Sequence, residues 1–98
     1  MKVFAWDPQK NDLLRQERGV SFEEVAFHIE NGDLLDEIEH PNLGKYAQQR
    51  MFIVRMENYA YLVPFVLTGD EVYLKTIIPS RKATRLYLGD ADEEDKIG

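Results

Sequence analysis

The residues best suited to chemistry gather near position 80, where three cations follow a serine. Ser80 is suited to cap a helix, because its hydroxyl can accept a hydrogen bond from a free amide of the first helical turn. Arg81, Lys82 and Arg85 then add positive charge to a helix start that is already positive. Helix starts attract phosphate and other anions. Two interpretations stay open: the cations hold an anionic guest, or they pair with the chain's many carboxylates.

Charge is distributed unevenly along the 98 residues, whose formal net charge is -6. Residues 45–89 carry seven lysines and arginines against three acids, whereas residues 1–44 carry four against ten, and residues 90–98 carry one against five. A basic segment between two acidic segments indicates an anionic partner for the basic part. A solvated surface of mixed charge is the commoner explanation for any single one of these residues.

Composition excludes several classes of protein. The length fits one domain with a modest core, and a hydrophobic content of 44% argues against disorder. The absence of cysteine excludes thiolate nucleophiles and thiolate metal sites, and it is compatible with the reducing cytoplasm, where we expect the protein. No apolar run approaches the roughly 18 residues of a membrane helix, so we expect no membrane association. Residues 1–89 are expected to form the domain and residues 90–98 an acidic, frayed C-terminal tail.

The first helix is expected to follow a short strand over Val3–Trp6. Asp7 can cap this helix, and Pro8 suits its first position, where the missing N–H costs nothing. Gly19 supplies the stop after Arg18. The residues expected to face inward are Leu13 and Leu14.

The second helix is marked by a capping box, in which Ser21 is followed three residues later by Glu24. Helical spacing predicts that its buried face contains Phe22, Val25, Ala26 and Ile29. His28 falls off that face, so we expect it to be solvated. Residues 33–44 are expected to form no regular element, and the spacing of their carboxylates matches no known metal-binding loop. We therefore expect no metal and no cofactor.

Three β-rich runs follow, over Gln49–Met56, Tyr59–Leu67 and Glu71–Ile78. Their connections are short enough for hairpins, which predicts a three-stranded antiparallel meander. Both faces of the middle run are apolar, so we expect it to be covered on both sides, with a bulge or break at Pro64. A third helix is expected over Ser80–Leu88, packed through Leu86, Tyr87 and Leu88. The resulting α+β fold would have a sheet of three or four antiparallel strands, with the first two helices on one face.

Four stretches of the chain carry motifs: Phe4-x-Trp6-Asp7-Pro8-x-Lys10, Arg18-Gly19-Val20-Ser21-Phe22-Glu23-Glu24, Gln49-Arg50 and Ile77-Ile78-x-Ser80-Arg81-Lys82-Ala83-Thr84. In this order and spacing they resemble the BrnT family of bacterial type II toxins, and the resemblance spans Phe4 to Leu88. It implies a RelE-like fold and a metal-independent endoribonuclease that inhibits translation. Arg18 stands where the family pattern has histidine.

The resemblance also implies a mechanism in which the 2′-hydroxyl of RNA is the internal nucleophile and cations stabilise the phosphorane. The candidate cations are Arg50, Lys75, Arg81 and Arg85, of which Lys75 and Arg85 are chosen by position alone. His40 is the candidate general acid or base, because imidazole titrates near neutral pH, but no motif includes it, and a plain loop residue is the commoner interpretation. Tyr46 and Tyr73 are weaker choices. The residues expected to contact RNA are Lys82, Arg55 and Tyr73.

The partners that the resemblance implies are RNA and a cognate DNA-binding antitoxin encoded beside the toxin. The assembly would be a homodimer or a toxin–antitoxin hetero-oligomer. The alternative function is a non-catalytic protein-binding module, or an inactive toxin homologue, whose basic face meets an acidic peptide. One feature distinguishes the two functions. A ribonuclease needs a cluster of cations on the sheet face that carries the third helix, whereas a binding module can function with or without one.

Overall fold

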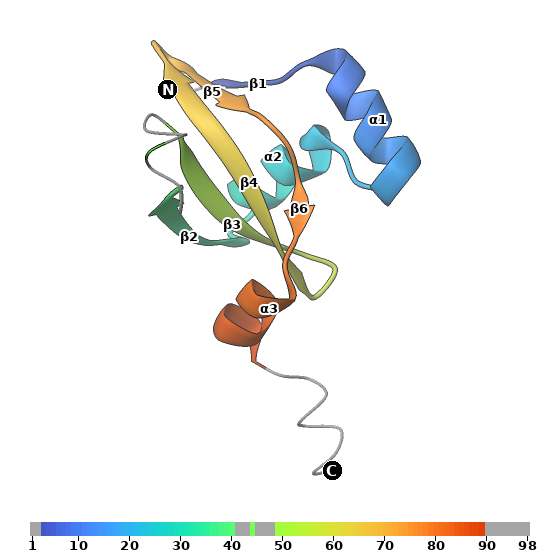
Figure 1. Ribbon diagram of the computed structural model, residues 1–98, viewed down its shortest axis with the longest axis vertical. Helices are drawn as coiled ribbons and strands as arrows, with labels where there is room; N and C mark the ends of the chain where they lie inside the picture. Colours follow the sequence, from blue (N-terminus) through green and yellow to red (C-terminus); the bar gives the residue numbers. More distant parts are fainter. Residues whose placement is uncertain (1–2, 41–43, 45–48, 90–98) are drawn as a thin grey trace.

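The computed structural model describes residues 3–40, 44 and 49–89. Within this part of the chain, three helices and six strands form an α+β fold (Figure 1). In chain order the elements are β1 (Val3–Ala5), α1 (Pro8–Arg18), α2 (Phe22–Glu30), β2 (Leu34–Glu39), β3 (Arg50–Met56), β4 (Tyr59–Thr68), β5 (Glu71–Leu74), β6 (Ile78–Pro79) and α3 (Arg81–Leu88).

The sheet is mixed, with strand order β1-β5-β4-β3-β2, and β6 pairs with β4 off this path. All pairs are antiparallel except β1 with β5, which is parallel. The predicted meander is therefore present as β3, β4 and β5. The expectation of a purely antiparallel sheet of three or four strands is wrong, because β1, β2 and β6 extend the meander.

β2 occupies a segment for which the sequence predicts no regular element. It pairs with β3, and its register shifts between Leu34 and Asp36. This irregularity breaks the alternation of apolar residues by which a strand is recognised, and acidic residues are depleted in strands generally. β2 has one neighbour in the described sheet, so its carboxylates can face water at the edge.

Pro64 determines where the predicted third strand is interrupted. The amide of Lys75 donates to the Pro64 carbonyl at 2.8 Å, but proline has no N–H to donate in return, so β5 ends at Leu74 and pairing with β4 resumes at β6. Backbone groups of one residue in an antiparallel sheet point to one neighbour. The ladder between β3 and β4 therefore continues past Met51 and Pro64, and the break expected in β4 itself is absent.

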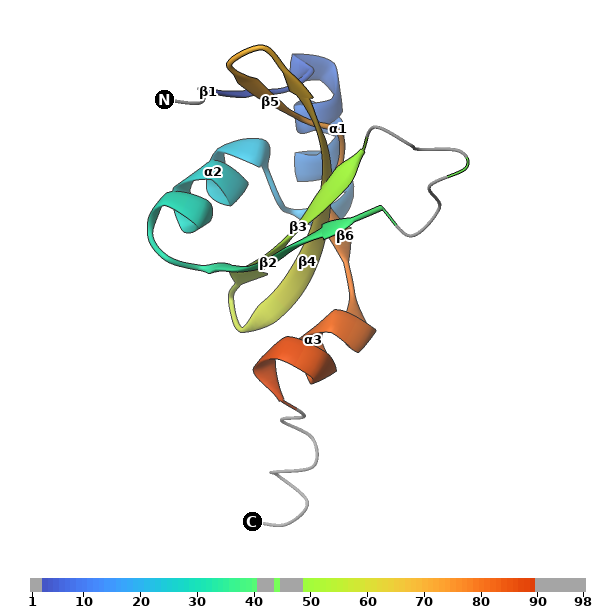
Figure 2. The ribbon, with the colours of Figure 1, turned by 90° about the vertical axis from the view of Figure 1, so that its left-hand side faces the viewer.

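β4 separates two apolar clusters, as the two apolar faces of its sequence predict. On one face α1 and α2 contribute Leu14, Phe22 and Val25 to a cluster around the stacked rings of Phe52 and Phe65, whose centroids are 3.8 Å apart. On the other face α3 packs through Ala83, Tyr87 and Leu88 on a second cluster that contains Ile53, Ala60 and Leu62. Figures 1 and 2 show α3 at one end of the sheet, away from α1 and α2.

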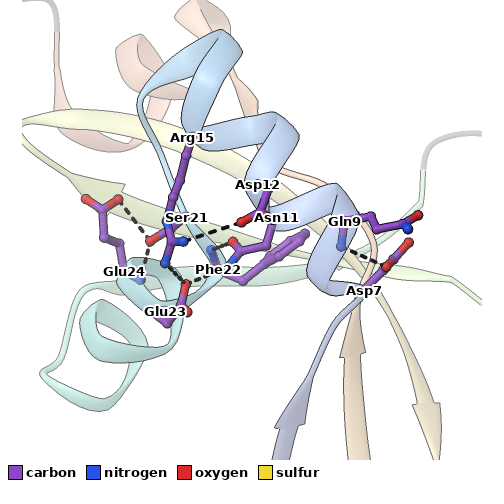
Figure 3. A network of polar contacts seen from close by, with 9 residues as sticks. All are labelled: Asp7, Gln9, Asn11, Asp12, Arg15, Ser21, Phe22, Glu23 and Glu24. Atoms are coloured by element: carbon purple, nitrogen blue, oxygen red, sulfur yellow. Dashed lines mark hydrogen bonds and ion pairs between the residues drawn. The ribbon is translucent and has the colours of Figure 1, made fainter.

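α1 and α2 are joined by a polar network that includes both helix caps (Figure 3). Asp7 accepts from the Gln9 amide and Ser21 from the Glu24 amide, so both predicted caps are confirmed. Asn11 lies between the helices and is only 4% exposed. Its Oδ1 accepts from the Phe22 amide at 2.7 Å, and its Nδ2 donates to Glu23 at 2.7 Å.

The inward face of α1 differs from the expectation. Leu14 is 2% exposed, but Leu13 is 46% exposed. Consecutive residues on a helix point about 100° apart, so one narrow buried stripe cannot hold both. Asn11, one turn before Leu14, occupies the second inward position instead.

Candidate functional site

α3 is held on the sheet by two hydrogen bonds to the backbone of Ala60, and a third links their two partners on the helix. The Ser80 amide donates to the Ala60 carbonyl at 3.0 Å, and the Ala60 amide donates to Thr84 Oγ1 at 2.9 Å. Thr84 Oγ1 in turn donates to the Ser80 carbonyl at 2.7 Å. Ser80 caps the helix by accepting from the Ala83 amide, as its sequence predicts. The first turn of α3 is thus fixed relative to β4, together with the cations that it carries.

The cations of α3 are exposed, and two of them have no carboxylate partner among the described residues. Arg81, Lys82 and Arg85 are all exposed. Neither Arg81 nor Lys82 forms an ion pair with any residue that the structure describes. The interpretation that the cations pair with carboxylates therefore does not account for Arg81 and Lys82 among the described residues.

Tyr73 and Lys75 lie on the same face of the sheet as α3. Tyr73 pairs with Val66 and Lys75 is bonded to Pro64, so by alternation along β4 both side chains share the face of Leu62. The ammonium of Lys75 lies 5.3 Å from the centre of the Tyr73 ring, which is within the range of a cation–π contact. The face thereby combines a cation with an aromatic ring, four to six residues further along β4 than Ala60, where α3 is anchored.

Arg55 lies on this face as well, but it already has a partner. It pairs across the strands with Ala60, which α3 covers, and its guanidinium lies 3.1 Å from Asp33. It also lines a cavity at the C-terminal end of α3 together with Thr84 and Gly89. Arg55 is half-exposed and so retains donors beyond this ion pair.

Arg50 is separated from the other candidates. It alternates with Met51 and shares the face of Phe52, which is the face of α1 and α2. Its Nε lies 2.9 Å from Glu37, whose cross-strand neighbour is Phe52 on that same face. The sequence assigned Arg50 and Arg81 to one site, and the backbone places them on opposite faces of the sheet.

His40 follows directly on β2, and its amide donates to the Gln49 carbonyl at 3.2 Å. Continuing the ladder from the Ile38–Met51 pair places His40 on the face of α3. β3 and β4 lie between it and Tyr73 on β5, however, so their backbones are about 14 Å apart at the usual strand spacing. His40 and Tyr73 therefore do not hydrogen-bond to each other. The remaining acid–base candidate, Tyr46, lies outside the described residues.

An apolar cavity of about 220 Å³ lies between α3 and the sheet. Its lining residues are Ile38, Met51, Ile53, Leu62, Ser80, Lys82, Ala83, Leu86 and Tyr87. Leu86 is 72% exposed, so the expectation that it packs in the core is wrong, and Ala83 takes the buried position. The hydrogen bond between Thr84 and Ala60 orients the first turn of α3 so that Ala83 faces the sheet, and Leu86 lines the cavity with Lys82.

A chain of polar groups that the sequence did not predict joins His28, Asp33 and Arg55. Asp33 contacts His28 Nδ1 at 2.7 Å and the guanidinium of Arg55 at 3.1 Å. The hydrogen bond from His28, more than that from Arg55, lowers the pKa of Asp33 below its ordinary value. His28 is therefore not simply solvated. The turn Asn31-Gly32 that ends α2 was the available signal, because it brings Asp33 back beside the last turn of the helix.

A tyrosine–carboxylate pair lies beside the cavity. The hydroxyl of Tyr87 donates to Asp36 at 2.7 Å. This hydrogen bond lowers the pKa of Asp36 and raises the pKa of Tyr87. The pair ties α3 to the edge strand β2. Arg18 donates to the Ile77 carbonyl just before β6.

Among the described residues, no group of three or more histidines and carboxylates is arranged to hold a metal ion. In the same part of the chain, no helix is both long and apolar enough to cross a membrane.

No family model, no curated protein and no solved structure matches this chain.

Proposed function

We propose that the chain is the toxin component of a type II toxin–antitoxin system and acts as a metal-independent endoribonuclease of the BrnT type, with a RelE-like fold. The observation that carries the proposal is the set of exposed basic residues on α3 and on the sheet face that α3 covers, added to the sequence resemblance. Arg81 and Lys82 have no described carboxylate partner, and Lys75 with Tyr73 lies on the same face. Such a surface suits a phosphate backbone with stacked bases.

The chemistry that these residues would perform is electrostatic. When the 2′-hydroxyl attacks, the phosphorane carries more negative charge than the phosphodiester, so a fixed guanidinium stabilises the transition state preferentially. The Ser80 cap fixes the backbone from which Arg81 projects, and a guanidinium can engage two phosphate oxygens at once. Lys75, Lys82 and Arg55 would position the RNA. Arg50 contributes to a different face, and its catalytic role is a separate hypothesis.

Growth arrest on induction in a bacterium tests the proposal, with purified protein and RNA in the presence of a chelator as the second assay. Arg81→Ala should lower the cleavage rate by about 10²–10³, the usual cost of losing one donor to a developing oxyanion. Lys82→Ala should have a smaller effect, since Lys82 stands at the cavity. Lys10→Ala, on α1, is the matched control for the loss of one cation and should change nothing.

Arg50→Ala separates two versions of the proposal. Full activity would restrict the catalytic surface to the face of α3, whereas loss of activity in a folded variant would require RNA to reach both faces around the edge of the sheet. Circular dichroism of each variant reports whether the fold is kept. A folded Arg81→Ala variant that is as toxic as the parent would show that the site is assigned wrongly.

The apolar cavity supports a second candidate, a protein-binding module without catalytic activity. Its walls are largely apolar and its edge carries Leu86 and Lys82, a composition that suits a partner with one apolar anchor in an acidic surrounding. Both candidates include an antitoxin-like partner. Co-expression with the product of the adjacent gene tests for it, and a parent chain that binds this product but neither arrests growth nor cleaves RNA would favour the binding module.

A further inference from the structure

The basic surface around α3 lies next to the most acidic stretch of the chain. Residues 90–98 follow directly on Gly89, which ends α3, and they contain five acids against one lysine. Residues 81–89, which include α3, carry three cations and no acid, a net charge of +3, and residues 90–98 carry a net charge of -4. The two opposite charges are therefore held close together by the covalent chain itself.

The segment is long enough to extend along the whole of α3. α3 has eight residues and is about 12 Å long, whereas nine extended residues span up to about 30 Å. A chain leaving Gly89 can thus turn back along the whole helix, past Arg85 and Lys82, and reach the first turn. Ile97 is the only large apolar residue in the segment, and the cavity beside Leu86 has walls that would accept such a side chain.

We propose that residues 90–98 bind in cis to the basic surface of α3, with the acids on Arg81 and Lys82 and Ile97 at the apolar cavity. The segment then competes with any polyanion for the same cations. At the effective concentration of a short tether, which is of the order of millimolar, even a weak contact is populated. The contact would explain how a chain with a net charge of -6 carries a cationic surface, because its acidic segment would cover that surface. Only the identity of the displaced polyanion as RNA rests on the proposed function.

A spin label tests the contact without any assay of activity. The chain has no cysteine, so Lys96→Cys gives one attachment site for a nitroxide and leaves all five acids of the segment in place. We expect the amide signals of Arg81–Leu86 to broaden at low salt and to recover at about 1 M salt, where the Debye length is only about 3 Å. The amide signals of α1 serve as the internal control. Broadening of α3 and α1 alike, or none that depends on salt, would overturn the proposal.

Binding of a short labelled oligouridylate measures the competition. The variant D92N/E93Q/E94Q should bind it roughly two- to tenfold more tightly than the parent, the factor expected when a weak tethered competitor is removed. The matched control removes the same number of charges elsewhere on the exposed surface, in E17Q/E30Q/E71Q. Equal tightening in both variants would mean that net charge alone is responsible, and the proposal would fail. If neither protein binds the oligonucleotide, the proposed function fails, and the spin-label result still decides whether the segment binds.

Discussion

Replacing Asn11 by alanine should destabilise the protein more than its position on a polar helix suggests. The substitution leaves the Phe22 amide, which belongs to a fully buried residue and is the first N–H of α2, without its acceptor. An unpaired buried amide costs about 1–3 kcal/mol. Loss of the hydrogen bond to Glu23 adds up to about 1 kcal/mol, discounted because that carboxylate is half-exposed.

The expected loss in the free energy of unfolding is therefore about 2–4 kcal/mol, and urea unfolding followed by circular dichroism measures it. The midpoint should fall by about 1–2 M urea with an unchanged slope. Glu23→Gln is the control, because it keeps Asn11 on the Phe22 amide, and it should cost less than about 1 kcal/mol. If Asn11→Ala and Glu23→Gln shift the midpoint equally, Asn11 does not hold the start of α2.

Three further predictions concern stability. Leu14→Ala should cost about 2–5 kcal/mol and Leu13→Ala less than about 1 kcal/mol in the same urea assay, because only Leu14 is buried; similar losses would contradict the described orientation of α1. Phe22→Ala should cost about 3–5 kcal/mol, and an unchanged thermal midpoint would place Phe22 outside the core. The pKa of Asp33 is lowered mainly by His28, so the stability that it contributes is present above about pH 4 and is lost as the pH falls through its folded value. The free energy of unfolding of Asp33→Asn should therefore depend less on pH in the acid range than that of the parent, and identical slopes would rule out this linkage.

Local signals in the sequence predicted the helices well, because each is encoded within a few residues. Asp7 with Pro8, Ser21 with Glu24, and Ser80 each cap a helix at the predicted place. Such caps are satisfied by amides two or three residues away, so no knowledge of the tertiary structure is needed.

The strands at the edges could not be predicted in the same way. β2 carries three carboxylates and a register shift. β6 is a strand because its two residues pair with Tyr61 and Leu62 of β4, on the N-terminal side of Pro64. Both depend on a partner that is distant in sequence. The same reason limits the site: sequence adjacency cannot reveal that Arg50 and Tyr73 lie on opposite faces, since alternation fixes a face only once the register of β3, β4 and β5 is known.

The parallel pair of β1 and β5 has a consequence for the order of folding. Val3 pairs with Glu71, 68 positions further along the chain, whereas the Asn11–Phe22 contact closes a loop of only 11. On a ribosome that synthesises the chain from its N-terminus, α1 and α2 can associate early, but β1 has no partner until β5 emerges. β1 is therefore made well before β5, with which it pairs. β1 is a short strand at the edge of the described sheet, and it is paired with β5 only. Its amides should therefore be among the first in the sheet to exchange hydrogen with solvent.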